Sequence, residues 1–176
     1  MEIKAKCSFD FVSIKALTLV SAFRTFNPKK RFIIISIFSF LLAAFLLFEI
    51  LYFYEFSLFI FFLVLVFLYT RECCLHFLLP KIRYKALANM QNTINEYTFC
   101  EDNLKIHTIS KECNGDTQIE YSLLVKVYET SDYLFLYQPQ NQVFIVDKST
   151  ITDGTVEDIK NKLKSYVKKK YYICKY

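Results

Sequence analysis

One long run of hydrophobic residues dominates the pattern of this chain. In residues 32–70 only two side chains are charged, Glu49 and Glu55, and neither glycine nor proline interrupts the run. The hydrocarbon core of a bilayer is about 30 Å thick, so a helix with 1.5 Å rise per residue needs roughly 20 apolar residues to cross it. The run is about twice that length, and it therefore predicts two membrane-spanning helices.

We expect the first helix at residues 31–50 and the second at residues 54–73, joined by a turn that carries Glu49, Tyr52, Tyr54 and Glu55. The turn position favours solvation of the two carboxylates at the membrane interface over an ion relay. A single tilted span and the core hairpin of a soluble protein are the alternatives. The rest of the chain offers no second apolar layer to cover two helices so rich in Phe, Leu and Ile, which argues against the core hairpin.

Basic residues flank the apolar run on both sides. Those before it are Arg24, Lys29, Lys30 and Arg31, and those after it are Arg71, Lys81, Arg83 and Lys85. Lys and Arg beside membrane segments are retained in the cytoplasm. The chain is therefore predicted to be a multi-pass protein of the cell membrane with both termini cytoplasmic and the lipid bilayer as a partner.

Short β-rich runs follow the membrane segment. After a helical connector predicted at residues 81–95, with Pro80 at its start, runs of about five residues recur at roughly ten-residue spacing, at 97–100, 104–108, 117–121, 126–130, 133–137 and 142–147. In the second run Leu104 and Ile106 alternate with Lys105 and His107, so His107 is expected on an outer face. Residues 111–116 are predicted to form a loop. Such spacing is typical of an antiparallel meander that closes toward a barrel or sandwich.

Helices are predicted near both ends of the chain. Residues 3–9 alternate as a strand, and residues 11–26 are expected to form a helix. Near the other end, Thr155 and Asp158 have the spacing of a capping box. The helix that they begin is expected to pack on the sheet through Val156, Ile159, Leu163, Tyr166 and Val167. The predicted organisation is an N-terminal strand and helix at 1–30, a transmembrane hairpin at 31–73, a connector helix at 74–95 and a cytoplasmic domain at 96–176.

Neither the cysteines nor the glycines indicate a reactive centre. The six cysteines show no repeated pair spacing, and the cluster of Cys73, Cys74 and His76 lacks the fourth ligand that a structural zinc needs. The two glycines, Gly115 and Gly154, exclude a P-loop or a dinucleotide fingerprint. We therefore expect no cofactor, no metal and no enzymatic activity.

The terminal helix and tail are rich in lysine. The formal net charge of the whole chain is +5, and the last twenty residues alone account for an equal excess. Anionic lipid headgroups are the predicted partner of these lysines, because no nucleic-acid recognition motif accompanies them. A solvated face that only keeps the domain soluble is the alternative. The predicted membrane-surface residues are Lys29, Lys30, Arg31, Lys160, Lys164, Lys168, Lys169 and Lys170.

Several segments between residues 97 and 166 are similar to those of a known family. These segments are Ile119-Glu-Tyr-Ser122, Lys126-Val-Tyr-Glu-Thr130, Tyr133-Leu-Phe-Leu-Tyr137 and Phe144-Ile-Val-Asp-Lys148, and together they resemble the YcxB-like family of bacterial membrane proteins. The resemblance implies an α+β membrane protein. In it, a two-helix transmembrane hairpin is inserted in a small antiparallel pleckstrin-homology-like β-barrel or sandwich, and a C-terminal helix caps the domain. It implies no activity and no catalytic residues.

Two functions remain open at the level of sequence. The first is a membrane-anchored cytoplasmic binding module that recognises a lipid headgroup or, at a sheet edge, a protein segment. The alternative is a structural or regulatory subunit of a membrane transport or signalling complex, which contacts its protein partner through the hairpin. Both functions are assigned to the domain by analogy with other proteins of similar fold.

Overall fold

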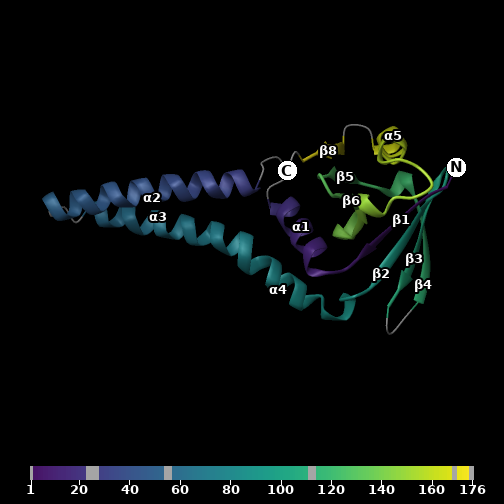
Figure 1. Cartoon of the computed structure of the whole chain (residues 1–176), viewed down its shortest axis with the longest axis horizontal. Coiled ribbons are helices and arrows are strands. Elements are labelled where there is room, and N and C mark those ends of the chain that lie inside the picture. Colours follow the sequence, from purple (N-terminus) through teal and green to yellow (C-terminus); the bar gives the residue numbers. More distant parts are fainter. Residues whose placement is uncertain (1, 23–27, 54–56, 111–113, 168–169, 175–176) are drawn as a thin grey trace.

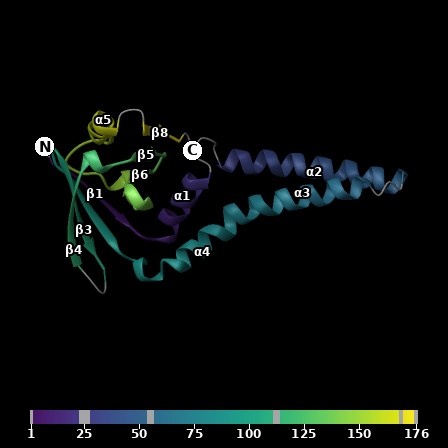
Figure 2. The ribbon, with the colours of Figure 1, turned by 180° about the vertical axis from the view of Figure 1, so that it is seen from behind.

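The chain folds into a long helical hairpin attached to a domain of two sheets (Figure 1). The computed structural model describes residues 2–22, 28–53, 57–110, 114–167 and 170–174. Within these ranges the fold is α+β, as predicted, with helix α1 (Phe11–Ala22) and helix α5 (Val156–Val167) packed against the sheets. The hairpin projects from one end of the domain, and no other element covers it in either view (Figures 1 and 2).

The hairpin consists of α2 (Pro28–Phe53) and α3 (Ser57–Cys73). Both predicted helices are confirmed as helices, although α2 is longer than expected at each end. Glu49 and Tyr52 consequently lie on α2 and not in a turn, while Tyr54 and Glu55 lie outside the described residues. By length and composition, the segments Lys30–Glu49 and Ile60–Ala86 are both able to cross a membrane.

The second hairpin helix does not end at Cys73. It continues through one π-helical turn (Cys74–Leu78) into α4 (Leu79–Ala86), and the N–H of Leu79 donates to the carbonyl of Cys74, five residues back. Pro80 lies just after this wider turn, which accommodates a residue that has no N–H to donate. The predicted connector is thus corrected at both ends: its helix is continuous with α3, and it stops at Ala86, followed by a short 3₁₀ turn (Ala88–Met90).

The first sheet is antiparallel throughout. Its strands are β1 (Ile3–Ser8), β2 (Ile94–Phe99), β3 (Asn103–Ile109) and β4 (Asn114–Glu120), in that order. Ala5, Tyr97 and Ile106 pair across three strands and are buried, while Lys105 is exposed, so the predicted alternation is confirmed. Residues 114–116, which were expected in a loop, belong to β4 because they pair with residues 107–109.

The second sheet contains a parallel pair that the sequence did not predict. Its order is β7 (Val143–Asp147), β6 (Tyr133–Tyr137), β5 (Lys126–Glu129) and β8 (Tyr171–Ile173). The strand β8 runs parallel to β5, because α5 carries the chain back along the sheet. The described strands therefore form two open sheets. Of the two predicted forms, barrel or sandwich, the closed barrel is wrong because no pairing closes the sheets.

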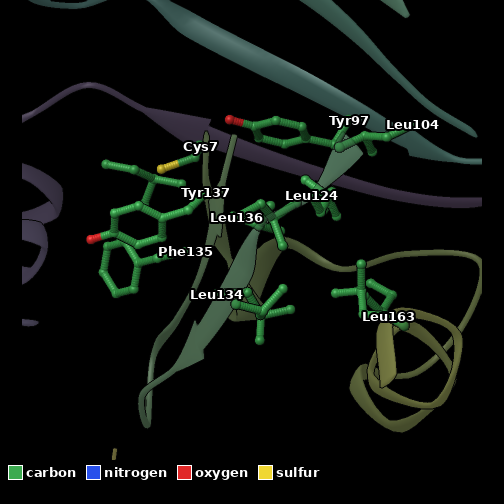
Figure 3. Close-up of a cluster of buried hydrophobic side chains, with 14 of the residues drawn as sticks. Cys7, Tyr97, Leu104, Leu124, Leu134, Phe135, Leu136, Tyr137 and Leu163 are labelled. Atoms are coloured by element: carbon green, nitrogen blue, oxygen red, sulfur yellow. The ribbon is translucent and has the colours of Figure 1, made fainter. Parts of the chain in front are cut away.

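One hydrophobic core lies between the two sheets. Figure 3 shows Tyr97 and Leu104 of the first sheet on one side of the cluster, and Leu134 and Leu163 on the other. Successive side chains of β6 are buried on both faces of the strand, and α1 packs against this strand. The N-terminal strand β1 also contributes to this core, although the whole hairpin separates it from β2 in sequence.

Helix α5 packs on the sheets much as predicted. Its residues Ile159, Leu163 and Val167 are buried, and Thr155 and Asp158 form the expected reciprocal capping bonds. Tyr166 is the exception, because it is 42% exposed; its ring is tilted against that of Tyr121, with 5.2 Å between the ring centroids.

Candidate functional site

A pocket of about 530 Å³ lies where the hairpin joins the domain. Three parts of the fold form it: α1, the end of α4, and the strands β5, β6 and β7 of the second sheet. Its lining combines two basic residues, three hydroxyl-bearing residues and four apolar residues, namely Arg83, Lys126, Ser21, Tyr128, Tyr137, Leu17, Ala86, Leu87 and Val143.

The charge of the pocket is wholly positive. Arg83 lies on the last turn of α4 and Lys126 begins β5, and no acidic side chain is part of the lining. Among the described residues, neither cation forms an ion pair with a carboxylate. Two cations without a counter-ion in one cavity create a local positive potential, which favours an anionic ligand.

Aromatic rings position Lys126. Its ammonium lies 4.6 Å from the centroid of the Tyr137 ring and 5.6 Å from that of Tyr128, and the two rings meet edge to face. The negative faces of the rings attract the ammonium and direct it along the wall of the pocket. The rings therefore hold this cation without a carboxylate partner among the described residues.

Hydroxyl groups line the same wall. The hydroxyl of Ser21 donates to the carbonyl of Leu17 at 2.8 Å, so at 3.4 Å it accepts a weak bond from the hydroxyl of Tyr137. This contact links α1 to β6 across the pocket. The arrangement offers two positive groups to one bound group, which is a chemistry suited to binding oxyanions, and hydroxyl oxygens beside them are able to accept hydrogen bonds.

The surface lysines predicted from the sequence lie in different surroundings. Lys30 and Lys170 are exposed, and Lys164 is exposed with its ammonium 5.4 Å from the ring centroid of Tyr171. Arg31 donates to Glu72 at 2.9 Å. Lys168 and Lys169, and the side chain of Lys29, lie outside the described residues.

Lys160 has a role inside the domain. Its side chain is only 15% exposed, and its ammonium lies 3.1 Å from Glu157 and 3.6 Å from Glu129. Lys160 is therefore less available as a surface contact than Lys30 and Lys170, which are exposed.

Glu129 is the centre of this buried ionic group. It accepts hydrogen bonds from Lys148 at 2.8 Å and from Tyr171 at 2.8 Å. Burial alone raises the pKa of Glu129, but these two hydrogen bonds and the charges of Lys148 and Lys160 outweigh it, so the pKa lies below its usual value. The ionised carboxylate thus ties together β5, the turn after β7, α5 and β8.

A second ionic group, which sequence analysis missed, lies at the base of the hairpin. Glu72 on α3 is buried, and Arg31 on α2 and Arg71 both donate to it. Nδ1 of His76 lies 3.1 Å from the carbonyl of Glu72, and the ring of His76 lies 4.9 Å from that of Phe32. The sequence did contain a signal for this ionic group. Glu72 and His76 are four residues apart beside the apolar run, which places them one turn apart on the same face of a helix.

His107 and the cysteines lie apart from the pocket. His107 is on the outer face of the first sheet, as predicted, and its Nδ1 lies 2.6 Å from Oδ1 of Asp116. Burial raises the pKa of Cys7 to about 12, so this thiol is unreactive. In the part of the chain that the structure describes, no cluster of His, Cys, Asp or Glu is large enough to hold a metal ion.

The pocket itself was not predicted from the sequence. Arg83 was assigned only to the basic flank of the membrane run, and Lys126 only to a strand, because the two are far apart in the chain. The only sequence signal for the pocket was Lys126, which begins the β-rich run at residues 126–130 two residues before Tyr128.

One part of the chain matches a known protein family. Residues 107–163, from β3 to α5, match the family model described as YcxB-like protein. No curated protein and no solved structure matches the chain. The matched segment supplies the strand wall of the pocket, including Lys126 and Tyr137, whereas Ser21 and Arg83 lie outside it. The resemblance inferred from sequence is confirmed for this segment, which makes residues 107–163 a YcxB-like region.

Proposed function

We propose that this protein is a membrane-anchored, non-catalytic binding module. Its hairpin spans the membrane, and its two-sheet domain lies in the cytoplasm and binds a ligand in the pocket. The observation that carries the proposal is the position of this pocket: its two basic residues lie where an exposed apolar hairpin joins a separately packed domain.

The exposure of the hairpin supports the membrane anchor. Large apolar side chains on α2 and α3 are exposed along the length of both helices, among them Ile34, Phe38, Phe40, Phe45, Phe61, Val64 and Phe67. Such a surface is unfavourable in water, whereas in a bilayer it is solvated and the backbone bonds of each helix are satisfied internally. Buried residues make up only 6% and 11% of the two candidate spans, unlike the core helices of a soluble protein.

The distribution of charge along the hairpin supports the cytoplasmic location. Basic residues gather at its base, at Lys30, Arg31, Arg71, Lys81 and Lys85. The described residues at the far end, 46–53 and 57–66, include no Lys or Arg. The base is thus the end that the positive-inside rule assigns to the cytoplasm.

The arrangement of the domain is compatible with a pleckstrin-homology-like fold. Two four-stranded sheets enclose one core, and an amphipathic helix near the C-terminus packs against them. Domains of this architecture present loops and sheet edges for binding, which suits a module without catalytic residues.

Thiol labelling in intact cells tests the anchor and its orientation. A reporter cysteine at Tyr52, near the far end of α2, should react with a membrane-impermeant reagent in intact cells. A reporter at Lys105, on the exposed face of β3, should react only after the membrane is opened. The opposite pattern would place the domain outside, and labelling of both sites in the soluble fraction would refute the anchor.

A groove on the hairpin favours the second candidate function, that of a subunit in a membrane complex. It has a volume of about 630 Å³ and lies between α2 and α3, with Ser36, Ser39 and Ala43 on one side. A Phe at Ala43 would fill the groove, whereas a Phe at the exposed neighbour Ala44 would not. Loss of a co-purifying protein in Ala43→Phe alone would support the subunit function.

A further inference from the structure

We infer that the pocket between α1, α4 and the second sheet binds the phosphate-bearing headgroup of an anionic phospholipid. The inference rests on the proposed function, because it needs the hairpin to hold the pocket at the membrane surface. It identifies the ligand class of that site.

The two cations of the pocket determine the charge of the ligand. The guanidinium of Arg83 presents parallel donors that match two oxygens of a phosphate, and the ammonium of Lys126 adds a second positive charge. No carboxylate in the lining competes for either group. An anion that entered would form charge-assisted hydrogen bonds with groups that otherwise have no ionic partner among the described residues.

Hydroxyls and rings on the strand wall suit the remainder of a headgroup. Tyr128, Tyr137 and Ser21 line the cavity next to the cations. The hydroxyl oxygens of Ser21 and Tyr137 are able to accept hydrogen bonds from the hydroxyls of a glycerol headgroup, while the apolar Leu17, Leu87 and Val143 would contact the carbon atoms of the ligand.

The length of the helix places the pocket at the level of the headgroups. From Ile60 to Arg83 the chain is helical without a break, so the path along the helix between them is about 35 Å at 1.5 Å per residue. A bilayer has a hydrocarbon core of about 30 Å and a total thickness of about 40–45 Å. If Ile60 lies at the far edge of the core, Arg83 lies within the near headgroup layer.

Exposed apolar residues on the same helix favour a lipid over a soluble phosphate. Phe77, Leu78 and Ile82 are exposed at the level just before Arg83. They continue the apolar surface of α3 up to the mouth of the pocket, where acyl chains would contact them. A soluble phosphate compound would gain nothing from these residues.

Lipid retention by the intact chain tests the inference. The full chain, purified in mild detergent, is mixed with equal amounts of phosphatidylglycerol and phosphatidylcholine that carry the same acyl chains, and native mass spectrometry counts the lipids retained. We expect a preference for phosphatidylglycerol, and at least about a tenfold loss of that preference in the double variant Arg83→Gln/Lys126→Gln, since every 1.4 kcal/mol lost is tenfold in affinity.

A matched control removes the same charge elsewhere. Lys81 on α4 and Lys105 on β3 are exposed and do not line the pocket, so Lys81→Gln/Lys105→Gln should keep the preference. An equal loss in both double variants would show general surface attraction and overturn the site. Near-UV circular dichroism compares the folding of the variants.

A second variant blocks the pocket without a change of charge. Ala86 lines the pocket but is exposed, so Ala86→Trp should be accommodated by the fold while it obstructs the cavity. The loss of lipid preference should match that of the double variant, and full retention of the preference would refute the pocket as the binding site. The fluorescence of this Trp, absent from the native chain, should change when phosphatidylglycerol is added if lipid contacts the mouth of the pocket.

Soluble competitors distinguish the sources of the phosphate. Dihexanoyl phosphatidylglycerol should displace the retained lipid at much lower concentration than glycerol 3-phosphate. Equal potency would assign the pocket to a soluble phosphate compound and overturn the lipid inference, and displacement by a short acidic peptide alone would assign it to a protein partner. Recovery of the native chain in the soluble fraction without detergent would instead refute the membrane anchor itself.

Discussion

The hairpin and the two-sheet domain use similar apolar residues in opposite ways. On α2 and α3, Phe, Ile and Leu point outward, and Leu46 is the single apolar residue there that the structure describes as buried. In the domain, the same residue types fill one core between the sheets, and charged residues other than the ionic group around Glu129 lie toward the outside. If the hairpin lies in a bilayer as proposed, the difference teaches that the solvent around each region, and not composition, determines where an apolar residue is stable.

The two regions meet through α1 and α4. The ring of Phe11 lies edge to face with the ring of Tyr84, 5.7 Å away, and α4 continues directly from the hairpin. The pocket lies at this junction, so a single ligand there would contact both regions.

The largest expected effect concerns the inside of the domain. Leu163 is fully buried under the sheets, and Leu163→Asp should lower the free energy of unfolding by about 3–5 kcal/mol, because it buries an unpaired charge. At the adjacent position, Lys164→Asp should cost about 1 kcal/mol or less, since only an exposed ring contact is lost. Urea unfolding of the full chain in detergent measures both, and equal costs would contradict the assigned face of α5.

The next prediction compares the same substitution at two exposed apolar residues, one in the hairpin and one in the domain. Phe40, near the middle of α2, is 74% exposed, and Leu123 in the domain is 52% exposed. In a bilayer, Phe40→Asp should cost about 3 kcal/mol of insertion free energy, and Leu123→Asp should have almost no effect in water. The fraction that resists alkaline extraction from membranes measures this difference. If Phe40→Asp were as harmless as Leu123→Asp, the outside of the hairpin would face water.

A smaller effect depends on pH. Because the pKa of Glu129 is lowered in the folded state, its contribution to stability is present above its ordinary pKa near 4.5 and is lost as the pH falls through the lower, folded-state value. Glu129→Gln should therefore cost about 1–3 kcal/mol at pH 7 and lose most of that cost in acid. Thermal unfolding between pH 7 and pH 3 tests this, with Glu101→Gln on an exposed turn as the control. A cost that stayed constant over this range would show that the ionised carboxylate is not the stabilising group.

The smallest expected effect compares two glycines. A Cβ at Gly154 would lie 2.7 Å from Cγ1 of Ile3, a buried residue, whereas a Cβ at Gly115 would have nothing within 4 Å. We expect Gly154→Ala to destabilise the domain by about 1–2 kcal/mol, and Gly115→Ala to be neutral or slightly stabilising. Thermal unfolding distinguishes the two, and equal melting temperatures would show that Ile3 moves aside without cost.

Much of the fold follows from local sequence patterns. The apolar run predicted the hairpin, alternation predicted the inner face of β3, and the spacing of Thr155 and Asp158 predicted the start of α5. Each of these depends on residues close in the chain, where helical or strand periodicity decides which side chains share a face. The surface contact predicted for the remaining lysines, and the absence of catalysis, stay predictions.

The tertiary structure decided what depends on residues far apart in the chain. The sequence had no local signal that β8 would pair in parallel with β5, that two open sheets would form, or that Glu129 would hold Lys160 inside the domain. The pocket is the clearest example, since Arg83 and Lys126 are brought to one cavity only because α4 and the second sheet both pack against α1. By itself the sequence determined where each region has apolar residues and how regularly they recur. Only folding determined which distant charges meet, because contacts across elements depend on packing and not on periodicity.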